Sequence, residues 1–183
     1  MERFLTLYGS GELSLRKTEE NLLAQNAELS AHGLTLSREQ AVAIAESRRH
    51  ALEANGRVEF AAGIPEKIVR AFCDSPYVDN ATFADTVAEL LDLFYTYKNE
   101  TLDRIGDDDL IAYMKKYYNG VCRGSLDLLA GIELERLARD VRAGRKGEAA
   151  DLPSGRDVTD DDFGSAEEEE KGEWSDGDGE ETY

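Results

Sequence analysis

Cysteine and histidine are scarce in this chain of 183 residues, and their scarcity excludes two classes of protein. Two cysteines are too few for the disulfide framework of a small secreted protein. The four soft ligands are scattered at His32, His50, Cys73 and Cys122, whereas zinc sites use closely spaced pairs. We therefore expect no metal site and no cofactor. Cys73 lies on an apolar helical stripe, so both cysteines are interpreted as small, buried core residues rather than nucleophiles.

Long apolar runs and catalytic sequence motifs are missing as well. No stretch of about eighteen apolar residues occurs, so we expect no transmembrane helix. The first residues lack the continuous apolar core of a signal peptide. The chain has no phosphate-binding loop, no HExxH motif, no paired CxxC motif and no EF-hand loop. These absences predict a cytoplasmic protein without a membrane partner and leave enzyme activity uncertain.

Basic residues are outnumbered by acidic ones, 21 to 39, which gives a net charge of −18. Such a charge repels the phosphates of nucleic acids, so we expect no nucleic-acid partner. Fifteen acidic residues and only four basic ones fall in residues 145–183. That segment is too poor in apolar side chains to offset the entropy lost on ordering. The sequence therefore predicts a helical domain over residues 1–144 and a disordered acidic tail over residues 145–183.

Apolar residues in the domain recur with the spacing of amphipathic helices. The pattern predicts six helices joined by short turns, at about residues 13–31, 38–54, 64–74, 83–105, 108–118 and 126–141. We therefore expect an all-α fold, an irregular bundle of about six helices. The alternative is an α+β fold in which residues 57–62 pair with the N-terminus as a small ribbon.

Several helix boundaries carry specific signals. Ser37 and Gln40 have the spacing of a capping box at the start of the second helix. Asn55-Gly56 is typical of a left-handed helix end. Pro65 suits the first turn of the third helix, where its missing N–H would be unpaired in any case. Asn80 or Thr82 is expected to cap the fourth helix, and Ser125 the last one. Phe72 and Phe94 fall on apolar stripes and are expected in the core.

Charged residues placed beside these apolar stripes form the candidate site. They are Arg57, Glu59, Lys67, Lys98, Glu100 and Arg123. Arg48 also lies next to an apolar stripe, that of the second helix, but it is not among the six selected residues. Side chains alternate along an extended segment, so Arg57 and Glu59 should point to the same side. The expected ion pairs are Arg57 with Glu100 and Lys98 with Glu59. Arg123 precedes the last helix, whose free N–H groups could hold an anion. The group is either a set of structural ion pairs or a polar pocket.

Five segments of the chain resemble, in this order and spacing, an uncharacterised family of Gram-positive bacterial proteins, domain-of-unknown-function family 6323. The segments read NGRVEF, EKIVRAFCDSPYV, DLFYTYKNETLD, DDDLIAYM and CRGSLDLLAG, and the likeness covers about residues 33–142. The chain differs from the family pattern in its acidic tail and at Ala61-Ala62, where a glycine is expected. The resemblance implies a bacterial cytoplasmic protein. The family brings no known activity, cofactor or partner with it, so the resemblance leaves the function open.

Two functional hypotheses of different class follow from the sequence. The favoured one is a small helical protein-interaction or regulatory module with a protein partner, because no catalytic signature is present. The alternative is an enzyme or a small-anion-binding domain that uses the charged cluster. An accessible void surrounded by these side chains would favour the alternative.

Overall fold

The computed structural model describes residues 3–59 and 63–145, and the side chains from residue 13 onwards within these ranges. The helices are α1 (Arg3–Ala24), α2 (Asn26–Leu29), α3 (Arg38–Ala54), α4 (Ile64–Phe72), α5 (Phe83–Glu100), α6 (Asp107–Asn119), α7 (Leu126–Leu128) and α8 (Glu135–Arg142). A 3-10 turn, Ser30–His32, follows α2, and a π-helical segment, Leu129–Leu134, joins α7 to α8. The predicted all-α fold is confirmed. No strand occurs within the two described ranges.

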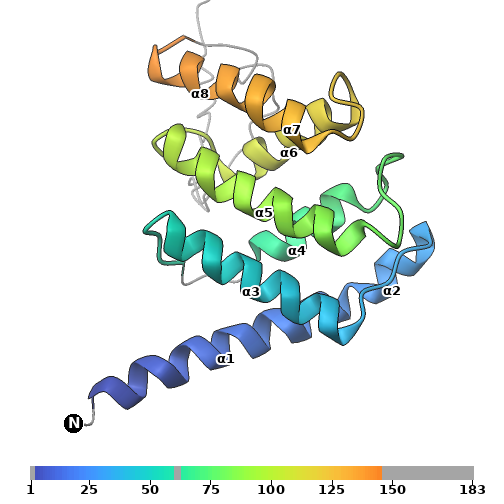
Figure 1. The fold of residues 1–183 in the computed structure, drawn as a ribbon, viewed down its shortest axis with the longest axis vertical. Helices are drawn as coiled ribbons and strands as arrows, with labels where there is room; N and C mark the ends of the chain where they lie inside the picture. Colours follow the sequence, from blue (N-terminus) through green and yellow to red (C-terminus); the bar gives the residue numbers. More distant parts are fainter. Residues whose placement is uncertain (1–2, 60–62, 146–183) are drawn as a thin grey trace, which may run out of the picture.

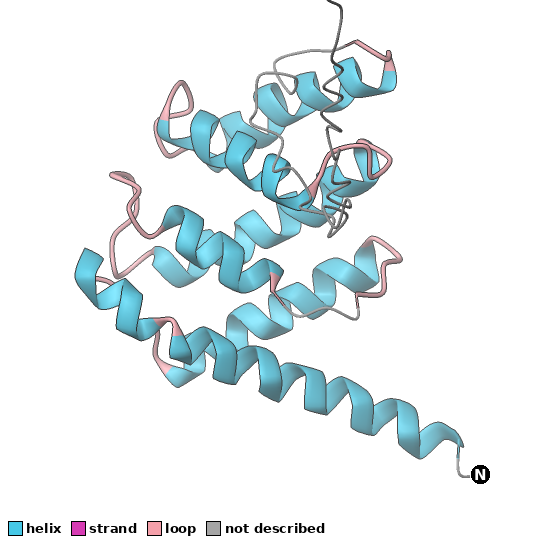
Figure 2. Ribbon diagram, turned by 180° about the vertical axis from the view of Figure 1, so that it is seen from behind, coloured by secondary structure: helices cyan, strands magenta, loops and turns pink. Residues whose placement is uncertain are grey.

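The helices stack in two layers (Figures 1 and 2). One layer contains α3, α5 and the α7–α8 segment, and α4 and α6 lie behind it. Helix α1 packs against α3 and α4 at one end of the stack, and its N-terminal end projects away from the other helices. The core between the layers includes Phe72 and Phe94, both buried as predicted. Cys73 and Cys122 are buried free thiols.

The local signals at α3 and α4 form as the sequence predicts. The Ser37 hydroxyl accepts a hydrogen bond from the Gln40 N–H, and the Gln40 side chain accepts one from the Ser37 N–H. Gly56 follows α3 with a φ of 61°, a left-handed conformation that glycine adopts without steric cost. Pro65 lies in the first turn of α4. These three features fix where α3 starts, where the segment from Arg57 begins and where α4 starts.

Other boundaries differ from the predictions for local reasons. Helix α1 begins at Arg3 instead of about residue 13 and continues through Gly9 and Gly11, because glycine weakens a helix without necessarily ending it. Helix α5 ends at Glu100, before Gly106. The predicted caps Asn80 and Thr82 do not cap α5, and the Asp79 carboxylate accepts from the Ala81 and Thr82 N–H groups instead.

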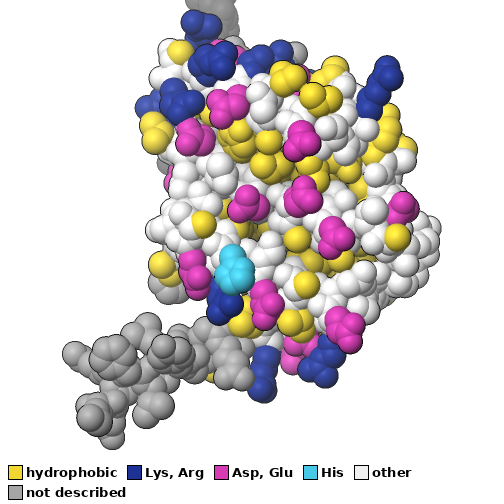
Figure 3. All heavy atoms as spheres, in the orientation of Figure 1, with side chains coloured by type: hydrophobic (Ala, Val, Ile, Leu, Met, Phe, Trp, Pro, Cys, Tyr) yellow, Lys and Arg dark blue, Asp and Glu magenta, His cyan; other side chains and the backbone are white. Residues whose placement is uncertain are grey.

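Charged side chains are scattered among hydrophobic and other side chains on the face of the molecule seen in Figure 3. Acidic side chains are spread across its middle, and Lys and Arg gather at the end where α8 lies. The predicted tail over residues 145–183 falls outside the described residues from position 146 onwards.

Candidate functional site

The six predicted site residues lie in four parts of the fold. Arg57 and Glu59 belong to the segment between α3 and α4, and Lys98 and Glu100 to the last turn of α5. The remaining two, Lys67 and Arg123, are on α4 and between α6 and α7. Arg57 and Lys98 lie close together because both contact Asp103. Glu100, Lys67 and Arg123 form ion pairs or lie on the surface away from this group.

Arg57 attaches its segment to the end of α5. Its Nη2 and Nη1 donate to the two Asp103 carboxylate oxygens at 2.7 and 2.9 Å, and Nη1 also donates to Asn99 Oδ1 at 2.8 Å. The Asn99 amide donates in turn to the Asn55 carbonyl at 2.9 Å. This bidentate geometry suits the planar guanidinium. Val58, the next residue, is 78% exposed, which agrees with side chains alternating along the segment.

Glu59 is held on the same side of the segment by residues from two helices. Its Oε2 accepts from Arg48 Nη2 on α3 at 2.8 Å and from the Tyr95 hydroxyl on α5 at 2.6 Å. Burial and the hydrogen bond to Glu59 raise the pKa of Tyr95, so it stays protonated and donates. Burial, the largest single effect, lowers the pKa of Arg48, but the hydrogen bond to Glu59 together with the interactions with Tyr95 and with the Glu59 charge outweighs it, so the pKa is raised.

Lys98 joins the end of α5 to the start of α6. Its Nζ donates to the Ile105 carbonyl at 2.7 Å and lies 2.7 Å from Asp107 Oδ1 and 3.6 Å from Asp103 Oδ1. The intervening turn is strained, because Leu102 and Asp103 both have a φ of 55° and neither is glycine. We call Arg57, Lys98, Asp103 and Asp107 the Lys98 cluster. The ion pairs of this cluster hold the turn between α5 and α6.

The two predicted ion pairs are wrong. Arg57 pairs with Asp103 instead of Glu100, and Lys98 pairs with Asp107 instead of Glu59. Lys98 and Glu100 are two residues apart on a helix, so their side chains diverge and cannot face one returning segment. Glu100 turns towards α8 and pairs with Arg142 there.

Lys67 and Arg123 lie on the surface. Lys67 Nζ is 2.7 Å from Asp108 Oδ1, and both side chains are largely exposed. Arg123 is exposed, and its backbone is left-handed with a φ of 48°. The predicted N-cap, Ser125, is confirmed, since its hydroxyl accepts from the Leu128 N–H at 3.3 Å. That α-helix has three residues and its cap is filled from within the chain, so it gives Arg123 no anion site.

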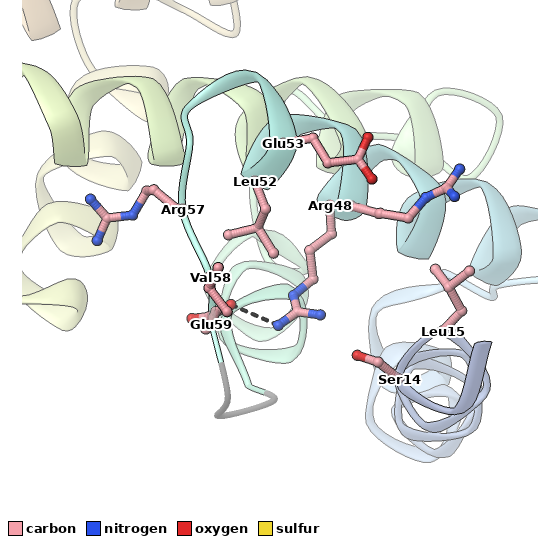
Figure 4. A pocket seen from close by; sticks show the side chains of 9 residues that line it. Ser14, Leu15, Arg48, Leu52, Glu53, Arg57, Val58 and Glu59 are labelled. Carbon is pink, nitrogen blue, oxygen red and sulfur yellow. Dashed lines mark hydrogen bonds and ion pairs between the residues drawn. The ribbon is translucent and has the colours of Figure 1, made fainter. Parts of the chain in front are cut away.

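A cleft opens beside Arg48, between α1, the second half of α3 and the segment that contains Glu59 (Figure 4). We call it the arginine cleft. It has a volume of about 200 Å³. The residues that line it include three arginines, two glutamates and three aliphatic side chains, namely Ser14, Leu15, Arg48, Arg49, Leu52, Glu53, Arg57, Val58 and Glu59. Thus two of the six predicted site residues, Arg57 and Glu59, line an accessible void.

Arg48 is the residue of this cleft with unused hydrogen-bonding capacity. Its side chain is only 7% exposed, and the guanidinium points into the space between Glu59 and α1 (Figure 4). Nη2 donates to Glu59, and no described residue accepts a hydrogen bond from the buried Nε. An unpaired buried donor costs about 1–3 kcal/mol. Such a group is typical of a site that a water or a ligand completes.

The sequence placed Arg48 beside the apolar stripe of α3 but did not select it as a site residue. Its position next to buried Ala41, Ile44 and Ala51 was the available signal, because an arginine there must be paired or functional. The roles of Tyr95 and Asp103 had no sequence signal. They depend on how α5 and the strained turn are placed in three dimensions.

No cysteine or histidine is among the residues that line the arginine cleft. Burial raises the pKa of the Cys73 thiol and that of the Cys122 thiol, which opposes thiolate chemistry at either position. Among the described residues, no cluster of three or more metal-binding side chains occurs. Within residues 3–59 and 63–145, no helix combines the length and apolar character needed to cross a membrane.

Comparison with protein-family models gives one match, which covers residues 21–147 and is described as a family of unknown function, DUF6323. The chain belongs to the DUF6323 family. The match confirms the resemblance seen in the sequence and is longer at both ends. It contains Arg48, Glu59 and Tyr95, and it leaves out Ser14 and Leu15, which form the α1 wall of the arginine cleft. Comparisons with curated proteins and with solved structures find no match.

Proposed function

We propose that this DUF6323 protein is a small cytoplasmic ligand-binding module that takes up a monocarboxylate in the arginine cleft. The observation that carries the proposal is the buried guanidinium of Arg48, which faces a cleft of about 200 Å³ with a donor that no described residue uses. Of the two hypotheses drawn from the sequence, this observation supports the small-anion-binding one.

The size and charge of the cleft restrict the ligand. At about 30 Å³ for each water, the volume corresponds to roughly seven water molecules, which suits a ligand of few atoms. Three arginines and two glutamates line it, and Arg57 is already neutralised by Asp103. The other two arginines balance the two glutamates, and a lining without net positive charge disfavours the two charges of a phosphate more than the single charge of a monocarboxylate. The side chains of Leu15, Leu52 and Val58 suit a short aliphatic tail.

The surrounding contacts preorganise Arg48 for this role. Glu59 holds Nη2, Tyr95 holds Glu59, and Arg57 fixes the segment that bears Glu59. A guanidinium fixed in this way loses little conformational freedom when an anion binds. The two free cysteines agree with a reducing cytoplasm.

Calorimetric titration of the full-length protein with butyrate tests the proposal. Arg48→Lys keeps one positive charge for Glu59 but removes the other guanidinium donors, so we expect butyrate to bind at least about tenfold more weakly. Arg142→Lys is the matched control, because Arg142 pairs with Glu100 outside the cleft and its change should leave the affinity unaltered. Equal affinity of the wild type and Arg48→Lys, or equal binding of phosphate and butyrate to the wild type, would contradict the proposal.

A further inference from the structure

Glu66 is a buried carboxylate that has no hydrogen-bond partner among the described residues. It lies in the first turn of α4, its residue is 8% exposed, and neither Oε1 nor Oε2 accepts a hydrogen bond from any described residue. A buried ionised carboxylate is unfavourable unless a positive charge or donors compensate it. The helix dipole favours a negative charge at this position, but it replaces only part of the lost hydration. The described residues therefore do not supply the group that this carboxylate needs.

Glu66 lines a cavity that the ligand of the arginine cleft does not use. The cavity lies between α1 and α4 and has a volume of about 380 Å³. Its lining is polar apart from Ala24 and Gly63, and it includes Asn21, Gln25, Glu66, Lys67 and Arg70. The cavity is thus large enough for a small polar molecule and carries both signs of charge.

The two cations of the cavity are engaged by residues other than Glu66. Lys67 Nζ is 2.7 Å from Asp108 Oδ1. Arg70 Nε donates to Gln25 Oε1 at 2.8 Å and lies 3.5 Å from Glu28 Oε2. Both side chains are about half exposed, so they lie towards the solvent side of the cavity while Glu66 is buried. The negative charge of Glu66 inside the cavity is therefore separated from the positive charges of Lys67 and Arg70 at its solvent side.

We propose that Glu66 binds the ammonium group of a small amine in this cavity. One carboxylate with amide groups nearby satisfies an ammonium, which needs a few hydrogen-bond acceptors, whereas calcium requires six to eight oxygen ligands. Lys67 and Arg70 then face the outer end of the bound amine, where they can meet a carboxylate of the same molecule. The shared chemistry is the ammonium group, and its source is either a simple amine or an amino acid.

Thermal unfolding of the full-length protein with two matched probes tests the proposal. The probes are n-butylamine and 4-aminobutyrate, which differ only in the terminal carboxylate, and sodium chloride is added to equal ionic strength. We expect at least one probe to raise Tm in a saturable manner. A rise with both indicates that the ammonium suffices, and a rise with 4-aminobutyrate alone indicates that Lys67 and Arg70 hold its carboxylate. No rise with either probe overturns the proposal.

Glu66→Gln keeps the shape of the side chain and removes its charge. We expect this variant to bind the effective probe at least about tenfold more weakly. Without ligand, its Tm should be higher than that of the wild type, because an uncompensated buried charge has been removed. An unchanged probe response overturns the proposal. So does a lower ligand-free Tm, because it means that Glu66 already has a partner in the free protein.

Two control variants separate this site from the others. Glu28→Gln changes an exposed carboxylate beside the same arginine, so the probe response should remain. Arg48→Lys alters the arginine cleft and should leave the amine response unchanged. Loss of the response in Glu28→Gln would show that the effect is one of general surface charge, and loss in Arg48→Lys would show that the probe binds in the arginine cleft. Either result would overturn the assignment to Glu66.

Discussion

The Lys98 cluster and the arginine cleft contain the same kinds of charged residue and differ in how completely these residues are paired. In the cluster, Lys98 is surrounded by a carbonyl and two carboxylates, and Arg57 uses both of its terminal nitrogens. In the cleft, Arg48 has one anionic partner and a buried Nε that no described residue uses. A complete set of partners indicates a structural role, and a donor left over beside a void indicates a binding role. Charge beside an apolar stripe does not distinguish the two roles by itself.

Replacement of Lys98 is the strongest test of the structural role that we assign to the Lys98 cluster. Lys98→Met removes a charge-assisted hydrogen bond to the Ile105 carbonyl and the ion pair that holds the strained turn. We expect a loss of about 2–3 kcal/mol in the free energy of unfolding, measured by urea denaturation. Lys67→Met is the control, since Lys67 makes an exposed ion pair worth about 0–1 kcal/mol. Equal losses in the two variants would mean that Lys98 is no more structural than a surface residue.

A double-mutant cycle between Arg57→Ala and Asp103→Ala tests the corrected pairing. Both side chains are partly exposed, so we expect a coupling free energy of up to about 1 kcal/mol. The same cycle between Arg57→Ala and Glu100→Ala should give no coupling, because Glu100 pairs with Arg142. Coupling in the second cycle but not in the first would restore the pairing predicted from the sequence.

A smaller effect is expected in acid. The hydrogen bond from Arg57 lowers the pKa of Asp103 below its ordinary value of 3.8, and Lys98 contributes to the shift. A lowered pKa in the folded state stabilises the protein above the unfolded value, and this stabilisation is lost as the pH falls through the lower, folded value. NMR titration of the Asp103 carboxyl carbon should therefore show protonation below pH 3.8 in the wild type. In Arg57→Ala the midpoint should move upwards, and an unmoved midpoint would contradict the assigned cause.

Local signals predicted the features of the fold that depend on neighbouring residues. Ser37 with Gln40, the turn at Gly56 and the first turn at Pro65 are each determined within a few residues, and all three form as expected. The start of α1 was predicted too late, because α1 continues through Gly9 and Gly11, and glycine weakens a helix without necessarily ending it. The hydrogen bonds that the Asp79 carboxylate accepts were not predicted, because Asp79 precedes Asn80 and Thr82, the two residues that were expected to cap α5.

The candidate site was less predictable because it depends on contacts across the fold. Alternation correctly placed Arg57 and Glu59 on one side of their segment. Their partners could not be read in the same way, because Asp103 reaches Arg57 only through two left-handed residues in succession. Arg48 from α3 and Tyr95 from α5 meet at Glu59, and no pattern within one helix encodes that meeting.

The guanidinium of Arg48 can be observed directly. In a ¹⁵N–¹H spectrum that resolves the arginine Nε–Hε groups, the full-length protein is titrated with butyrate, and Arg48→Lys identifies the Arg48 signal. We predict that this signal shifts progressively and reaches saturation, while the Arg142 signal stays in place. An Arg48 signal that butyrate leaves unmoved, or one that moves no more than that of Arg142, would contradict a carboxylate site in the arginine cleft.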